Sequence, residues 1–409
     1  MNVTAKLFLA LTGLALIFSL ATMTPAGAYP DGSLKSDQHG WWEHFKLVPR
    51  QINPAVPVLG TAEEAAASEP SAVAEVAPKV RGIYLTSWKA GDRPFVEKLV
   101  AMMVETRLNT LVIDVKDDTG NVSYPSGVAL AREIGADSRP KFEPLPLLEL
   151  LKANRIYPIA RIVVFKDPLL AKARQDLAVQ SNRGGLWRDR RGLCWVDPYQ
   201  QTVWEYNVAL AKEAARLGFK EIQFDYVRFT SDGPVKECRY PAADARSKAE
   251  LIRDFFSYAY RELSGLGVKV SADVFGLTCS AKDDLGIGQV FSEIAEEVDV
   301  ICPMVYPSHY YPGSYDLANP DREPYKTVLR SLSDARQKVI NNHKIIIRPW
   351  LQDFSLQSTY KAQQLVAQVK AVYDAGLEEW LFWNPTNKYE IEKYRFNIEQ
   401  HAQQAASER

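Results

Sequence analysis

The sequence is poor in histidine and lacks the common motifs of serine-hydrolase and nucleotide chemistry. Its five histidines are His39, His44, His309, His343 and His401. A His-rich metal hydrolase site needs several histidines at strand ends, so we expect no bound metal. There is no Gly-x-Ser-x-Gly elbow and no glycine-rich phosphate loop. A serine hydrolase of that type is therefore not indicated, and neither is a nucleotide cofactor.

The sequence also has no excess of charge of either sign. Lysine and arginine together number 49, aspartate and glutamate 50, and the basic residues are interleaved with acidic ones. Such a chain creates no field that would collect nucleic acid or an anionic membrane, and it has no basic stripe. We expect no nucleic-acid partner, and a substrate that is neutral or is matched by local charges.

Cysteine is scarce, with only Cys194, Cys238, Cys279 and Cys302. Their spacings match no zinc motif. An even number in an exported protein permits any of three disulfide pairings, and the sequence does not choose among them. Cys302 lies in an apolar run, where a buried free thiol is the default.

The first 28 residues have the pattern of a secretory signal peptide. Lys6 precedes an apolar run from Leu7 to Leu20, and Ala26-Gly27-Ala28 is typical of a cleavage site. An uncleaved membrane anchor is the alternative, but the run is shorter than the ~20 residues that span a bilayer comfortably. We expect export to the periplasm or the extracellular medium, with no stable membrane insertion after cleavage.

Residues 29–79 form an N-terminal segment and a linker. The segment contains Trp41, Trp42 and Phe45, which could dock on the main domain or a partner, although a small local cluster is the simpler interpretation. From Asn53 to Lys79 the chain is rich in Ala, Glu, Pro and Val, and it has too few large apolar groups to fold. We therefore predict a disordered linker ahead of a folded domain at 80–409.

That domain alternates short β-branched runs with amphipathic stretches, which is typical of βαβ units. The predicted strands are Val80–Leu85, Thr110–Val115, Pro158–Phe165, Glu221–Asp225, Lys269–Val274, Asp299–Val305, Ile345–Leu351 and Glu379–Trp383. The predicted helices are Pro94–Thr106, Pro146–Ala153, Gln201–Leu217, Ala249–Leu263, Ser292–Glu297, Tyr325–Asn341, Lys361–Ala375 and Glu390–Ala406. Eight strands, each followed by a helix, predict an α/β fold, the (β/α)8 TIM barrel. A doubly wound sheet is disfavoured because the first strand leads into no glycine-rich turn.

Active sites of such barrels lie at the carboxyl ends of the strands. Side-chain alternation points Asp225 and Asp273 into the barrel mouth, and it does the same for Asp114 and Lys116 if Leu111, Ile113 and Val115 pack outward. Other candidate substrate-binding residues are Arg161, Arg228, Tyr306, His309, Trp350, Asp353, Trp383 and Asn384. Carboxylates beside aromatic faces are suited to sugars, whose C–H faces stack on rings and whose hydroxyls need polar partners.

Glycosidic hydrolysis needs two carboxyl groups, and Asp225 and Asp273 can supply them. Neighbouring strands lie ~4.8 Å apart, which weakly favours the ~5 to 5.5 Å separation of retaining enzymes. The structural alternative is that Asp225 is a barrel-interior acid paired with Arg228 or Lys116. Similarly, Trp350 and Trp383 could only fill the core of the barrel, and His309 could be a loop residue without a role in binding. Asp117 and Asp118 flank a Thr-Gly turn, where turn capping is expected.

Four strand-end motifs resemble those of the bacterial putative glycoside hydrolase family of (β/α)8 barrels, which is distantly similar to the α-amylase superfamily. They are Leu111-Val112-Ile113-Asp114-Val115-Lys116-Asp117-Asp118-Thr119-Gly120, Ile222-Gln223-Phe224-Asp225-Tyr226-Val227-Arg228-Phe229, Ser271-Ala272-Asp273-Val274-Phe275-Gly276 and Pro303-Met304-Val305-Tyr306-Pro307-Ser308-His309-Tyr310. The resemblance implies a nucleophile at Asp225, an acid/base at Asp273, where amylases use glutamate, and a stabilising Asp353.

The sequence therefore predicts a glycoside hydrolase that acts on a carbohydrate polymer by a two-carboxylate mechanism. Asp273 would need a raised pKa to hold its proton near neutral pH. Two alternatives stay open: a non-catalytic polysaccharide-binding barrel of the cell envelope, and transglycosylation on the same residues.

Overall fold

The computed structural model describes residues 79–395. The predicted signal peptide at 1–28 lies outside this range, as does the segment and linker at 29–79 apart from Lys79. The predicted last helix, Glu390–Ala406, lies mostly outside it too. Where it is described it begins as a 3-10 turn, η8 (Ile391–Lys393), and not as an α-helix. The next residue, Tyr394, is tied to Asp353 by a hydrogen bond, which holds the chain in this turn.

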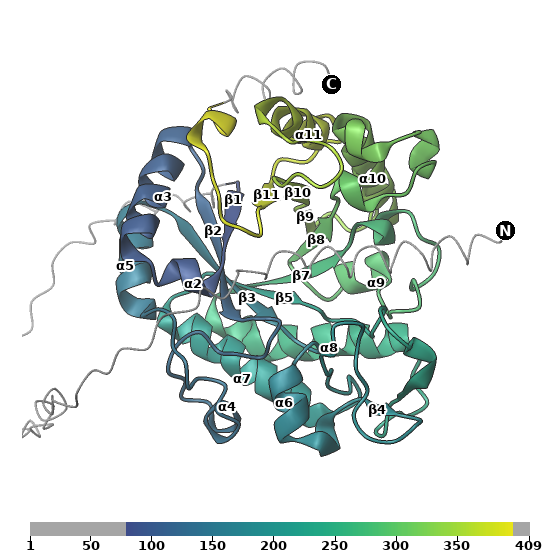
Figure 1. Cartoon of the computed structure of the whole chain (residues 1–409). Helices are drawn as coiled ribbons and strands as arrows, with labels where there is room; N and C mark the ends of the chain where they lie inside the picture. The colour runs from purple at the N-terminus through teal and green to yellow at the C-terminus, as the bar shows by residue number, and fades with distance from the viewer. Residues whose placement is uncertain (1–78, 396–409) are drawn as a thin grey trace, which may run out of the picture. The chain divides into compact units, whose positions relative to one another are not determined.

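A nine-stranded parallel sheet closes on itself at the centre of the described domain (Figure 1). The order β10-β11-β1-β2-β3-β5-β7-β8-β9 is completed by a pairing of β10 with β8, Trp350 with Met304. Its strands are β1 Arg81–Leu85, β2 Thr110–Lys116, β3 Tyr157–Val163, β5 Glu221–Asp225, β7 Lys269–Phe275, β8 Val300–Met304, β9 Ile346–Ile347, β10 Trp350–Gln352 and β11 Trp380–Trp383. The predicted (β/α)8 barrel is confirmed.

Two short strands share the seventh position of the barrel. β9 pairs with β8, and β10 pairs with β11. Arg348 and Pro349 lie between them, and proline has no N–H to donate to a strand ladder. The predicted run Ile345–Leu351 therefore occupies one barrel position but is interrupted in the middle.

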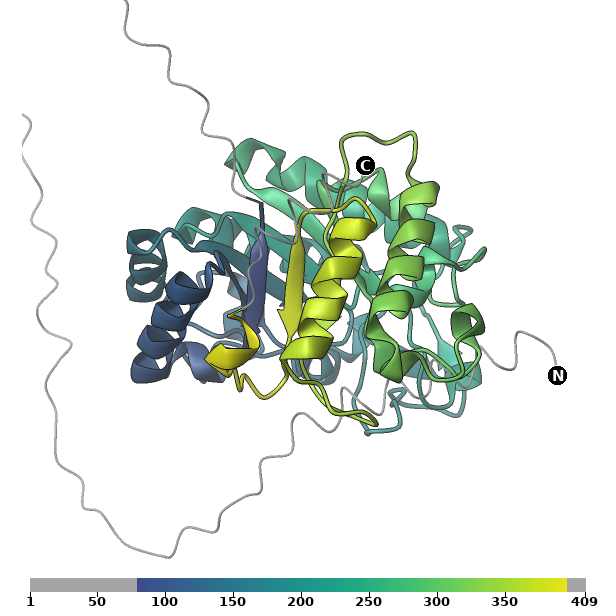
Figure 2. The same ribbon diagram turned by 90° about the horizontal axis from the view of Figure 1, so that it is seen from above.

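The helices surround the strands, and Figure 2 shows from above how they form a layer outside the sheet. The longer helices are α3 Arg93–Thr106, α5 Pro144–Ala153, α7 Gln201–Leu217, α8 Lys248–Leu263, α10 Pro324–Lys338 and α11 Ala362–Asp374, and the short ones are α2 Ser87–Ala90, α4 Ala129–Glu133, α6 Pro168–Ala173 and α9 Phe291–Ala295. Sequence signals fix several ends. A Ser247/Glu250 capping box starts α8, and Gly218 ends α7 with a left-handed φ of 117°. Within residues 79–395, no helix is long and apolar enough to cross a membrane.

A two-stranded antiparallel sheet stands beside the barrel, formed by β4 (Gln180–Ser181) and β6 (Cys238–Arg239). It joins the loop after β3 to the loop after β5, which are the segments that follow Arg161 and Asp225 in the chain. The pairing therefore ties together two loops at the carboxyl-terminal face of the barrel.

All four cysteines are unpaired thiols, so none of the three possible pairings forms. Cys302 is fully buried in β8, where its sulfur accepts a hydrogen bond from Gln223 at 3.3 Å. The prediction of a buried free thiol at Cys302 is confirmed.

The floor of the barrel is closed by a buried ion network. Arg348 donates from Nη1 to Glu221 at 2.7 Å and from Nε to Glu379 at 2.8 Å. The side chains of Arg348 and Glu221 are fully buried. Their charges can stay inside only because each one neutralises the other.

We expect Arg348→Met to lower the free energy of unfolding by about 3–5 kcal/mol, because it leaves two buried carboxylates without a cation. Urea denaturation measures this. Lys79→Met is the matched control: its ion pair with Glu378 is half exposed, and exposed pairs contribute little. Equal losses in the two variants would contradict a structural role for the network.

Candidate active site

One guanidinium holds the acidic residues at the mouth of the barrel together. Arg161 of β3 donates from Nη1 to Asp114 of β2 at 2.6 Å. It also donates from Nη2 and Nε to Oδ2 of Asp225, at 2.5 and 3.1 Å. Its Nε lies 4.0 Å from Oδ2 of Asp273. A single buried cation therefore faces three carboxyl groups, and all four side chains are nearly inaccessible to solvent.

Asp225 and Asp273 lie close to each other at the mouth of the barrel. Their strands β5 and β7 are neighbours, with Phe224 aligned to Ala272. Because Oδ2 of both aspartates lies near Arg161 Nε, at 3.1 and 4.0 Å, these two oxygens are no more than about 7 Å apart. This limit includes the ~5 to 5.5 Å separation of retaining glycosidases and excludes the longest separations, up to ~9.5 Å, of inverting ones.

The surroundings of Asp273 favour its protonated form. Burial raises the pKa of Asp273 well above its ordinary value, and the negative charge of Asp225 raises it further. Its Oδ1 accepts a hydrogen bond from Trp350 Nε1 at 2.7 Å. Its Oδ2 accepts none within residues 79–395 and is not closed off from solvent. The carboxyl group can therefore offer a proton to a bound ligand.

Asp114 is fixed from two sides. It accepts from Arg161, and also from the hydroxyl of Tyr84 in β1 at 2.5 Å. Burial raises the pKa of Asp114 to about 6, against the opposing effect of Arg161. Tyr84 was missed by the sequence analysis. Its parity on the first strand, between the outward-facing Ile83 and Leu85, was the available signal.

The backbone is strained directly after Asp225. Tyr226 adopts a φ of +54°, a conformation that costs a bulky residue of order 1–3 kcal/mol. Its N–H donates to Asp225 Oδ1 at 2.6 Å. Together with Arg161, this bond fixes both oxygens of Asp225. Strain of this kind is typical of functional sites.

Aromatic rings line the same mouth. Trp383 stacks on Tyr84 with centroids 3.9 Å apart, and it meets Trp350 edge-on. The buried Tyr306 hydroxyl has no hydrogen-bond partner within the described residues. Its pKa is raised well above its ordinary value by burial, and then by the charges of Asp273 and Asp225. The predicted Tyr306, Trp350 and Trp383 therefore do gather around the two carboxyl groups.

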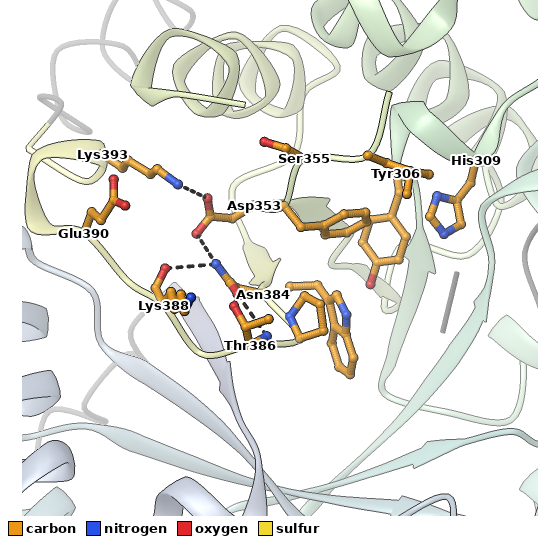
Figure 3. A pocket seen from close by; sticks show the side chains of 13 residues that line it. Tyr306, His309, Asp353, Ser355, Asn384, Thr386, Lys388, Glu390 and Lys393 are labelled. Atoms are coloured by element: carbon orange, nitrogen blue, oxygen red, sulfur yellow. Dashed lines mark hydrogen bonds and ion pairs between the residues drawn. The ribbon is translucent and has the colours of Figure 1, made fainter. Parts of the chain in front are cut away.

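A cavity of about 350 Å³ adjoins this cluster (Figure 3). It is lined by Tyr306, His309, Asp353, Phe354, Ser355, Leu356, Trp383, Asn384, Pro385, Thr386, Lys388, Glu390 and Lys393. Asp225 and Asp273 are not among the lining residues, whereas Tyr306 and Trp383 belong both to the cavity and to the aromatic surroundings of the carboxylates.

Asp353 belongs to a separate cluster within the cavity. It accepts hydrogen bonds from Asn384 and Lys393, both at 3.2 Å (Figure 3). It also accepts one from Tyr394 at 2.6 Å. It makes no bond to Arg161 or to either proposed reacting aspartate. The structure thus brings the predicted Asp353 and Asn384 together, but apart from the Arg161 cluster.

The prediction that Lys116 points into the barrel is wrong. Its Nζ lies 2.7 Å from Asp167 and 3.0 Å from Asn207 of α7, in the layer between strands and helices. The cause is a register shift between Asp114 and Lys116, which places an extra residue of β2 against β3. Such a bulge reverses the alternation on which the prediction rested.

Arg228 stands at the rim and is not paired with Asp225. Its guanidinium carbon lies 4.9 Å from the centroids of Trp195 and Tyr226, and 4.8 Å from that of Phe275. The structural alternative for Asp225 named Arg228 or Lys116 as its partner, whereas the observed partner is Arg161.

The loop after β2 shows the predicted turn capping at Asp117, whose carboxylate accepts from the N–H groups of Thr119 and Asn121 at 3.0 and 3.1 Å. Asp118 instead pairs with Lys166 at 2.7 Å. Within residues 79–395, no three or more His, Cys, Asp or Glu side chains form a group suited to a metal ion.

Residues 82–389 match a family model described as "Putative glycosyl hydrolase domain". The glycoside hydrolase domain of PgaB (BpsB) from Bordetella bronchiseptica is similar in fold, with a TM-score of 0.55, 13% identity, and coverage of 80% of this chain and 97% of that chain. The C-terminal domain of a putative chitinase from Desulfitobacterium hafniense DCB-2 gives a TM-score of 0.50 at 10% identity, over 79% and 99% of the two chains.

A hypothetical protein from Ruminiclostridium thermocellum ATCC 27405 is 41% identical, covering 47% of this chain and 97% of its own, with a TM-score of 0.44. No curated protein matches the sequence. The two likenesses at 13% and 10% identity support the barrel fold. The distant similarity to α-amylases stays a prediction.

His309 provides a test of burial at this site. Its Nδ1 lies 2.9 Å from the Ser308 hydroxyl, and burial lowers the pKa of His309 to about 3. The unfolded chain, with an ordinary pKa of about 6.5, then binds the proton more tightly, so stability is lost as pH falls below 6.5. Between pH 7 and pH 5, we expect the free energy of unfolding of His309→Gln to fall by about 2 kcal/mol less than that of the wild type. Urea denaturation at the two pH values measures this difference.

The exposed His343 is the control, since His343→Gln should leave the slope of stability against pH unchanged. A His309→Gln protein with the wild-type slope would show that His309 is not held neutral by burial.

Proposed function

This chain belongs to the putative glycosyl hydrolase domain family, as its strand-end motifs predicted, and we propose that its barrel hydrolyses the O-glycosidic bonds of a polysaccharide with Asp225 and Asp273 as the reacting groups. The observation that carries this proposal is the unequal treatment of two neighbouring carboxyl groups. Arg161 donates two hydrogen bonds to Asp225, whereas Asp273 is buried beside that negative charge and favours its proton. A carboxyl group that favours its proton, next to one that is hydrogen-bonded to a cation, is what acid-assisted glycosidic cleavage needs.

In this mechanism Asp273 Oδ2 gives its proton to the departing glycosidic oxygen. Asp225 attacks the anomeric carbon from the other side, and Asp273 then takes a proton from the water that releases the sugar. The alternative chemistry, in which Asp225 activates water directly, inverts the anomeric centre. We favour retention because the two aspartates lie near the carboxyl ends of adjacent strands. Identifying by NMR which anomer is released first distinguishes the two mechanisms.

The proposal assigns substrate binding to the polar and aromatic groups of the mouth. The Tyr306 hydroxyl, which lacks a partner within the described residues, can donate to a sugar oxygen near both carboxyl groups. Trp383 presents part of its ring to the adjoining cavity, where His309, Asp353 and Asn384 add polar groups. Asp114 positions Arg161 and does not itself react.

An exposed tryptophan supports a polymeric substrate. Trp88 lies in α2, directly after β1, on the carboxyl-terminal face of the barrel, and it is 70% exposed. Lys141, itself buried, places its Nζ 5.3 Å from the centroid of the Trp88 ring. A tryptophan fixed in this way can stack on a sugar beyond the bond being cleaved.

We also propose the chain organisation that the sequence predicts. Residues 1–28 direct export, residues 29–79 form the N-terminal segment and linker, and residues 80–409 carry the enzyme domain into the periplasm or the extracellular medium. The carbohydrate polymer would then be met outside the cytoplasm.

The first test is the release of reducing ends from bacterial surface and storage polysaccharides. We expect Asp225→Asn and Asp273→Asn each to lower the rate constant by roughly 10²- to 10⁴-fold, because each removes a reacting group. Asp244→Asn, at an exposed carboxylate paired with Arg246, is the matched control and should cleave normally. Polysaccharide binding without cleavage by the wild type would instead establish a binding barrel.

A second test concerns Trp88. We expect Trp88→Ala to raise KM for the polymer up to about tenfold, because one stacking contact contributes about 0.5–1.5 kcal/mol, and to leave KM for a short aryl glycoside unchanged. Tyr260→Ala, which removes a 40% exposed aromatic side chain from α8, is the control. An equal change for both substrates would place Trp88 outside the binding path.

A further inference from the structure

Arg228 occupies a distinctive place relative to the proposed reacting groups. It lies over the ring of Tyr226, the residue after Asp225, and over the ring of Phe275, two residues after Asp273. The Trp195 ring forms a third side. The guanidinium therefore sits at the rim beside the ends of both strands that carry the reacting carboxyl groups.

Arg228 differs from other buried cations in having no carboxylate partner. Lys116, Arg161, Lys166 and Arg348 each lie 2.5–2.7 Å from a carboxylate oxygen. Arg228 is only 6% exposed, yet within residues 79–395 no carboxylate lies within 4.0 Å of it. Burial lowers its pKa, partly offset by Tyr226 and by the more distant Asp232, Asp225 and Asp189. Its positive charge is thus desolvated without a direct counter-charge.

Its hydrogen-bonding capacity is also only partly used. Nη1 donates to Phe229 O at 3.0 Å and to Ser231 Oγ at 3.2 Å. In the part of the chain that the structure describes, Nε and Nη2 donate to nothing, and neither is sealed from solvent. The three rings stabilise the cation through their faces but accept none of these N–H bonds. What is left is a planar fork of donors, the arrangement that binds a carboxylate with two parallel hydrogen bonds.

We propose that Arg228 binds the carboxylate of an acidic sugar residue next to the scissile bond, so that the substrate is a carboxylated polysaccharide. This inference rests on the proposed function, because it concerns the substrate of the same site. It also agrees with the near-zero net charge of the chain: one local cation, and not a general positive field, recognises the anion.

The test compares polymers that differ only in the carboxyl group. A panel of carboxylated polysaccharides is presented together with the same polymers after reduction of their carboxylates to primary alcohols. For the polymer that the wild type cleaves, we expect kcat/KM to be about 10- to 100-fold higher on the carboxylated form, the worth of a charge-assisted hydrogen-bonded pair. Equal cleavage of both forms, or cleavage confined to neutral polymers, would overturn the proposal.

Variants separate recognition from structure. Arg228→Met keeps apolar bulk among the rings, and it should bring the ratio of kcat/KM between the two forms close to one, whereas Arg228→Lys should keep part of that ratio. Loss of activity by the same factor on both forms would assign Arg228 a structural role only. Melting temperatures of the variants identify any that fail to fold, and the wild-type comparison needs no variant.

Failure of the proposed function would give a different result. If the wild type cleaves nothing in the panel, the proposed hydrolytic function is wrong. Binding of the same polymers, measured by calorimetry, then tests the inference that Arg228 recognises a carboxylate. Preferential binding of the carboxylated forms, lost in Arg228→Met, supports it. Equal binding of both forms, or no binding, overturns it.

Discussion

The contacts of Arg161 determine the chemistry that the barrel mouth can perform. One guanidinium on β3 joins acids from β2 and β5 directly and reaches Asp273 on β7 at 4.0 Å, so four strands of the sheet converge on a single positive charge. Because all these side chains are buried, three ionised carboxylates would leave two charges without compensation in a medium that solvates them poorly. Protonation of Asp273 relieves this excess. Burial and the charge of the neighbouring Asp225 therefore favour the proton on Asp273, the proposed acid.

Much of this arrangement could be predicted from the sequence. The alternation of β-branched runs and helices gave the barrel, and strand parity placed Asp225 and Asp273 inward on adjacent strands. It failed at Lys116, because a bulge in β2 inserts one residue that a strict period of two does not anticipate. The central role of Arg161 was also missed, since parity shows that a side chain faces inward but not which inward groups meet. The resemblance to amylases implied a stabilising role for Asp353, and the structure holds its carboxylate in a separate cluster with Tyr394 and Lys393, about forty residues later in the chain.

The two ends of the barrel differ in how their buried cations are neutralised. At the floor, the charge of Arg348 is matched by Glu221 and Glu379, although its Nη2 has no hydrogen-bond partner within residues 79–395. At the mouth, the Tyr306 hydroxyl and the Nε and Nη2 groups of Arg228 have no hydrogen-bond partner within residues 79–395. The buried Tyr306 hydroxyl without a partner costs about 1–3 kcal/mol, and Arg228 has no carboxylate within 4.0 Å among the described residues. A ligand that supplies the missing partners would remove this cost. These polar groups lie at the same end of the barrel as the proposed reacting carboxyl groups.

The two acids of the Arg161 cluster whose pKa values are raised, Asp114 and Asp273, can also be told apart by their surroundings. Asp114 has both oxygens occupied, by Arg161 and by Tyr84, and its pKa of about 6 leaves it largely ionised at neutral pH. Arg161 already pairs with Asp114 and Asp225, so its positive charge stabilises a negative charge on Asp273 less strongly. Asp273 is only 1% exposed, but its Oδ2 accepts no hydrogen bond within the described residues and is not completely sealed from solvent. The proton thus stays on the carboxyl group that a ligand can reach, and Asp114 serves to hold Arg161 in position.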